Sequence, residues 1–91
     1  MVQVAVGQIV IWKSDPCDPG TPAVVTRVYA TSIDCSCFLR DGRYVIPHSG
    51  VRHVSDPLWP TLTPDAQYEG LFDITERDRL IDGMLRQAYK K

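Results

Sequence analysis

A stretch of alternating apolar residues that ends in a tight turn limits most strongly what this chain can fold into. Every second position of this stretch is apolar: Ile33, Cys35, Cys37 and Leu39. This period of two is typical of a strand with one buried face. Asp41-Gly42 follows at once, and this dipeptide is a strong signal for a β-hairpin turn. The stretch therefore predicts a strand, a hairpin turn and a second strand that begins at Tyr44.

Further short strands flank this hairpin. Runs rich in Val, Ile and Thr predict strands at Ile9–Trp12, Ala23–Tyr29 and Val51–Val54. A stiff, proline-rich loop separates the first two of them, and Ser49-Gly50 predicts a break before the last. Several short strands at this spacing are typical of a small barrel or sandwich, so the expected fold class is all-β.

The composition changes after Asp56, and this change sets the predicted domain boundaries. The small barrel is assigned to residues 1–56, with its strands between residues 4 and 56. Residues 57–72 contain three prolines and predict an extended linker with a short helical turn. Residues 73–91 predict a C-terminal amphipathic helix from about Thr75 to Tyr89.

The predicted helix carries an apolar stripe at helical spacing: Leu80, Ile81, Met84, Leu85 and Ala88. The stripe either folds back over a small barrel that needs extra burial, or pairs with the same helix of another copy. We expect the fold-back. Gly83 weakens the helix interior by roughly 1 kcal/mol relative to alanine, and it permits close approach of another backbone.

Length and charge narrow the possible classes of function. The chain has 91 residues, which is enough for one domain with a modest core. Its net charge of -1 is spread evenly, whereas nucleic-acid binders usually carry a basic patch. No stretch reaches the roughly 20 apolar residues that span a bilayer, so no membrane association is expected. Three cysteines without a secretory signal suggest reduced thiols in a cytoplasm.

The sequence shows no pattern of catalytic or metal-binding side chains. Cys35 and Cys37 are separated by one residue, whereas paired zinc ligands are usually separated by two or more. The strand alternation explains both cysteines as small core residues. Nothing in the sequence places a base beside Cys17, and His48 and His53 are interpreted as strand-end residues. We therefore expect no enzyme activity, no metal and no cofactor.

Aromatic residues and the helix stripe supply the candidate partner-binding residues. Tyr29 and Tyr44 lie on or beside predicted strands, and a tyrosine hydroxyl needs water or a partner. A core position and a place in a binding groove both remain open for them. Small barrels often bind peptides in aromatic-lined grooves. The candidates are Tyr29, Tyr44, Trp59, Leu80 and Met84.

The order of these segments resembles the plan of Src-homology-3-like barrels, and GQIVIW with PAVVTRV resembles the first two strands of ribosomal KOW-type modules. More narrowly, VGQIVIW, TPAVVTRVY, LRDG and VRHVSDP followed by a tryptophan resemble small uncharacterised barrel proteins of bacteriophages and prophages. The resemblance covers about Val6 to Trp59. It implies an SH3-like barrel of phage origin, located in a host cytoplasm or a virion, and it brings no catalytic residues.

These observations lead to two hypotheses about function. The first is a non-enzymatic protein-interaction module that works by self-association, as a homo-oligomer, or by docking to a larger assembly. The alternative is a KOW-like nucleic-acid-binding barrel, against which the balanced charge argues. The basic residues that would serve this alternative are Arg27, Arg40, Arg43 and Arg52.

Overall fold

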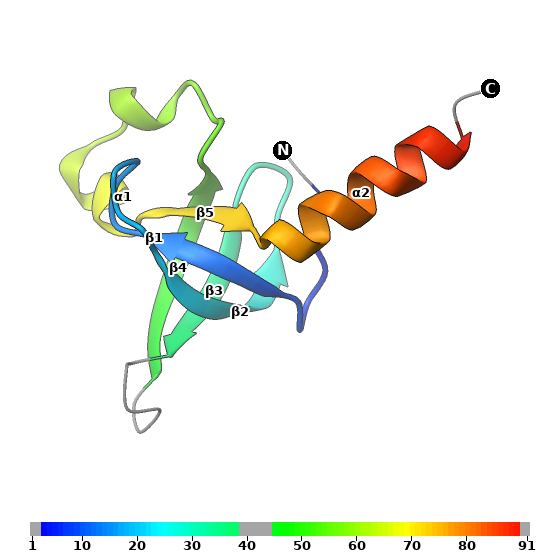
Figure 1. Cartoon of the computed structure of the whole chain (residues 1–91). Coiled ribbons are helices and arrows are strands. Elements are labelled where there is room, and N and C mark those ends of the chain that lie inside the picture. The colour runs from blue at the N-terminus through cyan, green and yellow to red at the C-terminus, as the bar shows by residue number, and fades with distance from the viewer. Residues whose placement is uncertain (1–2, 39–44, 90–91) are drawn as a thin grey trace.

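The computed structural model describes residues 3–38 and 45–89, except for the side chains at positions 82 and 85–89. Five strands form a closed barrel: β1 (Ile9–Lys13), β2 (Thr21–Val28), β3 (Ile33–Phe38), β4 (Val45–His53) and β5 (Leu71–Ile74). A 3₁₀ turn η1 (Trp59–Thr61) and the short helix α1 (Pro64–Tyr68) connect β4 to β5, and α2 (Glu76–Tyr89) follows β5 (Figure 1). The predicted fold class, an all-β SH3-like barrel with a C-terminal helix, is confirmed.

The alternating residues of β3 form the centre of the core. Ile33, Cys35 and Cys37 are 0%, 1% and 4% exposed, as the period of two predicts. On the neighbouring strand β2, Ala23 pairs with Cys37 and Val25 pairs with Cys35, and both are buried. Removal of side chains of this kind from water supplies most of the free energy that holds a small barrel together. The predicted turn at Asp41-Gly42 and the start of the strand at Tyr44 lie outside the described residues.

The break predicted at Ser49-Gly50 is wrong, because β4 continues through these residues as one strand with a β-bulge. Ile33 pairs with Val51 but Cys35 pairs with His48, so β4 has one more residue than β3 over this span. Gly50 has a φ of 68°, which glycine adopts at little cost. A single positive φ therefore absorbs the extra residue, and pairing resumes beyond it.

The fifth strand lies where the sequence predicted a linker and the start of a helix, so the barrel boundary at Asp56 is wrong. β5 pairs antiparallel with β1 and parallel with the end of β4, and it thereby closes the barrel. Leu71 and Phe72 are 1% and 0% exposed. The four residues of β5 show no alternation, because both Leu71 and Phe72 are buried. Their extended conformation depends on a partner strand on each side, which local sequence does not reveal.

A glycine lets β5 begin close to β1. Gly70 has a φ of +83°, and a Cβ atom there would lie 2.5 Å from the carbonyl oxygen of Lys13 and 2.6 Å from the ring of Trp12. The Trp12 Nε1 atom donates a hydrogen bond of 2.8 Å to the carbonyl oxygen of Glu69. The indole also stacks on His48 with a ring separation of 4.3 Å. Trp12 therefore links β1 to β4 and to the residues that lead into β5.

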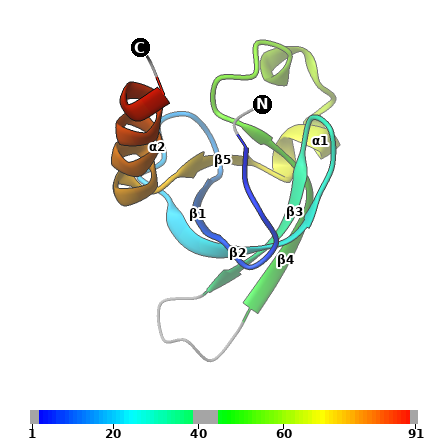
Figure 2. The same cartoon turned by 90° about the vertical axis from the view of Figure 1, so that its right-hand side faces the viewer.

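Both predicted helices are present. At the start of α1 the Thr63 side chain accepts a hydrogen bond from the backbone of Ala66, and Pro64 is the first helical residue. α2 leaves the edge of the barrel and extends away from it (Figures 1 and 2). Within the described ranges, no helix is both long and apolar enough to cross a membrane.

Candidate interaction surface

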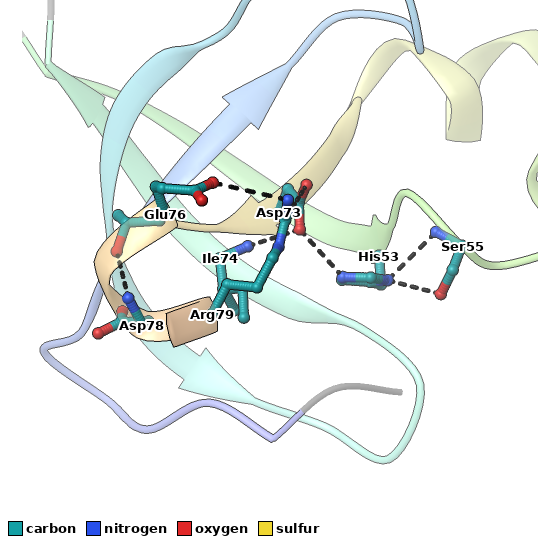
Figure 3. A network of polar contacts seen from close by, with 8 residues as sticks. His53, Ser55, Asp73, Ile74, Glu76, Asp78 and Arg79 are labelled. Carbon is teal, nitrogen blue, oxygen red and sulfur yellow. Dashed lines mark hydrogen bonds and ion pairs between the residues drawn. The ribbon is translucent and has the colours of Figure 1, made fainter. Parts of the chain in front are cut away.

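A carboxylate at the end of β5 anchors the base of α2 (Figure 3). Arg79 in α2 donates a hydrogen bond of 2.7 Å from Nη2 to Oδ2 of Asp73. The other Asp73 oxygen lies 3.4 Å from Nε2 of His53 at the end of β4. The hydrogen bond with Asp73, followed by the charge of Asp73, raises the pKa of Arg79. One half-buried carboxylate thus connects β4, β5 and α2.

The first turn of α2 is held by two further contacts. The Thr75 hydroxyl oxygen accepts a hydrogen bond of 3.2 Å from the backbone N–H of Asp78, which satisfies one of the free donors at the helix start. The Asp78 carboxylate in turn accepts a hydrogen bond of 3.2 Å from the side-chain amide of Gln8, just before β1. Together with the Asp73 anchor, these contacts determine the direction in which α2 leaves the barrel.

The contacts at the start of α2 also place a serine, a histidine and an aspartate in a row, but the ring nitrogens are reversed relative to serine hydrolases, in which the serine contacts Nε2 and the aspartate contacts Nδ1. The Ser55 hydroxyl oxygen lies 2.6 Å from His53 Nδ1, on the other side of the ring from Asp73. However, the Ser55 backbone N–H donates to the same nitrogen at 3.1 Å, so the contact closes a local turn two residues long. The second oxygen of Asp73 is occupied by Arg79. We interpret this cluster as part of the helix anchor.

Two hollows in the barrel surface are alternative candidate sites. One, of about 240 Å³, lies beside His53 and Ser55 and is bordered by the ion pair of Arg52 with Asp56, 2.8 Å apart. The other, of about 310 Å³, includes two carboxylates, of Asp34 and Glu69. Neighbouring backbone and side-chain donors already bind both carboxylates. Neither hollow shows an arrangement that points to one class of ligand.

The described residues of the apolar stripe of α2 are exposed. Leu80, Ile81 and Met84 are 61%, 43% and 70% exposed. The expected fold-back over the barrel is therefore wrong for the described part of the helix. β5 supplies the extra burial that the helix was expected to provide, because its Leu71 and Phe72 are almost completely buried. The stripe is left as an apolar surface on an element that projects from the molecule (Figure 2).

The aromatic candidates are dispersed. The Tyr29 hydroxyl donates a hydrogen bond of 2.9 Å to Asp34, while the residue as a whole remains 42% exposed. Trp59 is half-buried in η1. Trp59 belongs to the connection between β4 and α1, which lies at the left of Figure 1, whereas Leu80 and Met84 belong to α2, which projects to the right. Tyr44 lies outside the described residues.

Two of the four arginines named for nucleic-acid binding can be placed. Arg52 donates a hydrogen bond of 2.8 Å to Asp56. Arg27 is exposed, and its pKa is raised by a hydrogen bond with Tyr29 and by the charge of nearby Asp34. Each of these two cations therefore has a carboxylate close to it, which weakens its attraction for phosphate. Arg40 and Arg43 lie outside the described residues.

The cysteines lie in two different environments. Cys35 and Cys37 are core residues, and the pKa of Cys35 is raised by its hydrogen bond with Cys37 and by burial. The Cys35 thiol therefore stays protonated and unreactive at neutral pH. Cys17 is exposed in the loop after β1. In the part of the chain that the structure describes, no three His, Cys, Asp or Glu side chains gather as metal ligands would.

The fold and this surface define a class of protein: a small SH3-like barrel that carries a projecting amphipathic helix. Comparisons of the chain with models of protein families, with curated proteins and with solved structures found no match.

Asp34 is expected to make stability depend on pH. Desolvation opposes ionisation of its carboxyl group, but hydrogen bonds from Ser49, Tyr29 and Gly50 outweigh it and hold the pKa below the usual 3.8. A lowered pKa stabilises the folded state above the unfolded value, and this stabilisation is lost as the pH falls through the folded value. We expect Asp34→Asn to lower stability at neutral pH.

The deficit of Asp34→Asn relative to wild type should shrink as the pH falls from about 6 to about 3, measured by urea unfolding. Asp65→Asn, at an exposed position of α1, controls for the change in net charge. If the loss of stability in Asp34→Asn is the same at both pH values, ionisation of Asp34 does not contribute to the stability of the folded protein.

Proposed function

We propose that this protein is a non-enzymatic protein-interaction module of a phage or prophage, which acts by self-association or by docking onto a larger assembly. The exposed apolar face of α2 is the observation that carries the proposal. The phage origin, and with it a location in the host cytoplasm or the virion, rests on the resemblance of the segments between Val6 and Trp59 to phage-encoded barrels.

The helix α2 is only marginally stable by itself. α2 has 14 residues, and isolated helices shorter than roughly 12–15 residues are marginal in water. Gly83 in its interior lowers the helix propensity further. Helices of this kind are usually stabilised by packing of their apolar face. The barrel does not cover Leu80 or Met84, so a partner protein is the surface that would stabilise the helix.

The attachment of α2 to the barrel also favours docking, because it fixes the orientation of the helix and leaves its apolar residues exposed. Its base is tied to β5 through Asp73, to β4 through His53 and to the segment before β1 through Gln8, while the exposed residues lie beyond the first turn. A helix that is already oriented loses less conformational entropy when it binds. Exposed Leu and Met side chains spaced four residues apart, such as Leu80 and Met84, can insert into an apolar groove as anchors.

The test is affinity capture from the native host or from infected cells with a stripe variant, Leu80→Gln with Met84→Gln. Glutamine removes the apolar surface but keeps a high helix propensity. The matched control is Tyr68→Gln, which removes a side chain of a residue that is 78% exposed on α1. We expect wild type and control to retain a common partner that the stripe variant loses. Equal capture by all three proteins would contradict the proposal.

Tyr29→Ala tests whether the barrel contributes to the same interaction. Its ring is exposed, and aromatic residues carry a large share of the energy in many interfaces. If capture depends on α2 alone, Tyr29→Ala should behave like wild type. A loss as large as that of the stripe variant would move the interaction surface onto the barrel.

The nucleic-acid alternative is supported by the KOW-like segments but not by the charges near Arg27 and Arg52. Binding driven by phosphate weakens steeply with salt. In a gel-shift titration at low and at moderate salt, we expect no complex tighter than about micromolar. A tighter complex that is salt-sensitive and weakened by Arg27→Ala would replace the protein-interaction proposal.

A further inference from the structure

We propose that the partner of α2 is the α2 helix of a second copy, packed antiparallel to it; this inference rests on the proposed function and names its partner. The two copies would be related by a two-fold axis, so that the same face of each helix contacts the other. The exposed residues Leu80, Ile81 and Met84 would form the centre of the contact.

The distribution of charge along the helix favours this partner. Within α2, residues 76–82 contain three acidic and two basic side chains, whereas residues 83–89 contain one basic side chain and no acidic one, and Lys90-Lys91 follow in the sequence. In an antiparallel pair, the negative half of each helix lies beside the positive half of the other. In a parallel pair, the two positive halves lie side by side and repel each other. Charge complementarity of this kind selects the orientation of a complex.

The negative half has carboxylates available for such a contact. Glu76 lies 3.8 Å from Arg79, and its side chain is 77% exposed. Arg79 is shared between Asp73 at 2.7 Å and Glu76 at 3.8 Å, so a single cation lies beside two carboxylates. The basic residues beyond Gly83 therefore meet a net negative surface at the base of the opposite helix.

The position of the barrel also favours an antiparallel arrangement of the two helices. Each barrel lies at the N-terminal end of α2 and is much wider than the helix (Figure 1). In a parallel pair both barrels would occupy the same end and compete for space. In an antiparallel pair they lie at opposite ends of a helix about 21 Å long.

The midpoint of the stripe provides a position for the two-fold axis of the dimer. Its five positions run from 80 to 88, so position 84 lies at the midpoint. An axis near Met84 brings position 80 of one helix beside position 88 of the other.

Two helices of this length bury less surface than a standard protein interface, which predicts a weak dimer with a dissociation constant of about micromolar. Sedimentation equilibrium over a range of protein concentrations measures it directly. We expect the variant with Leu80→Gln and Met84→Gln to dissociate at least about tenfold more readily. The control Tyr68→Gln should match wild type, and circular dichroism should show that both variants keep the folded barrel.

Cysteine cross-linking tests the orientation. In a Cys17→Ser background, Leu80→Cys and Ala88→Cys are made in separate chains and mixed under mild oxidation. In the antiparallel pair, position 80 faces position 88, while like positions lie about 12 Å apart along the helix and beyond disulfide reach. We therefore expect cross-linked dimers in the mixture and few in either variant alone. Efficient cross-linking of Leu80→Cys alone would overturn the antiparallel arrangement.

The outcomes separate this inference from the proposed function. A protein that is monomeric at every concentration, yet captures a host protein only through an intact stripe, overturns the inference and leaves the proposed function standing. A dimer that is unaffected by the stripe variant overturns the inference as well, because the contact would then lie elsewhere. If dimerisation and capture both persist in the stripe variant, both proposals fail.

Discussion

A chain that ends at Asp56 is expected not to fold, although the sequence places the barrel boundary there. The truncation removes β5, and with it the buried side chains of Leu71 and Phe72. Loss of a large buried side chain typically costs about 2–5 kcal/mol, and the total stability of a domain is about 5–15 kcal/mol. The truncation also removes the strand that pairs with β1 on one side and with the end of β4 on the other. Circular dichroism and urea unfolding should show no cooperative transition.

The matched control is a chain that ends at Thr75. It lacks α2 but retains all five strands, so we expect it to unfold cooperatively, with a modest loss of stability from the missing anchor at Asp73. The comparison separates the closing strand from the helix that follows it. A cooperative transition in the shorter chain would contradict the role assigned to β5.

Among substitutions that add a single methyl group, Gly70→Ala is expected to cause the largest loss of stability, about 4 kcal/mol or more. The position combines a φ of +83° with contacts of 2.5 Å and 2.6 Å from the added Cβ to Lys13 and Trp12. The Lys13 contact is with a backbone atom of β1, which cannot rotate away as a side chain can. Relief therefore requires β5 to separate from β1, the strand with which it closes the barrel.

Gly50→Ala is the control that isolates the backbone conformation. Its φ is also positive, at +68°, but an added Cβ would meet nothing within 4 Å. We expect a cost of about 1–2 kcal/mol, the usual penalty for a left-handed residue other than glycine. Urea unfolding of both variants gives the difference. Equal losses would show that backbone conformation, and not the contact with Lys13 and Trp12, limits position 70.

The local sequence pattern was sufficient to predict the elements in which apolar side chains recur at a fixed spacing. The alternation at Ile33, Cys35 and Cys37 gave a strand with the correct buried face, because a period of two leaves one choice of face. The amphipathic helix and its start near Thr75 were equally predictable from spacing and capping. The candidate residues Leu80 and Met84 were identified in the same way.

The positions of these elements relative to one another were not predictable in this way. The prediction that α2 covers the barrel rested on the need of a small barrel for extra burial, and the unpredicted strand β5 contributes burial through Leu71 and Phe72. The cluster of Asp73, His53 and Arg79 that anchors the helix joins residues up to 26 positions apart, and no local motif marks it. The bulge at Gly50 likewise exists only because β4 has one more residue than β3 between the two pairs Ile33–Val51 and Cys35–His48.

The sequence by itself determined the all-β class, the buried face of β3, and the existence and apolar stripe of the C-terminal helix. These properties depend on interactions between residues that are close along the chain, so a short window contains their cause. Only the tertiary structure decided that Leu71–Ile74 is a strand and that the stripe is exposed. Both depend on which segment distant in sequence pairs with β1 and fills the core, and this pairing is determined by the whole chain.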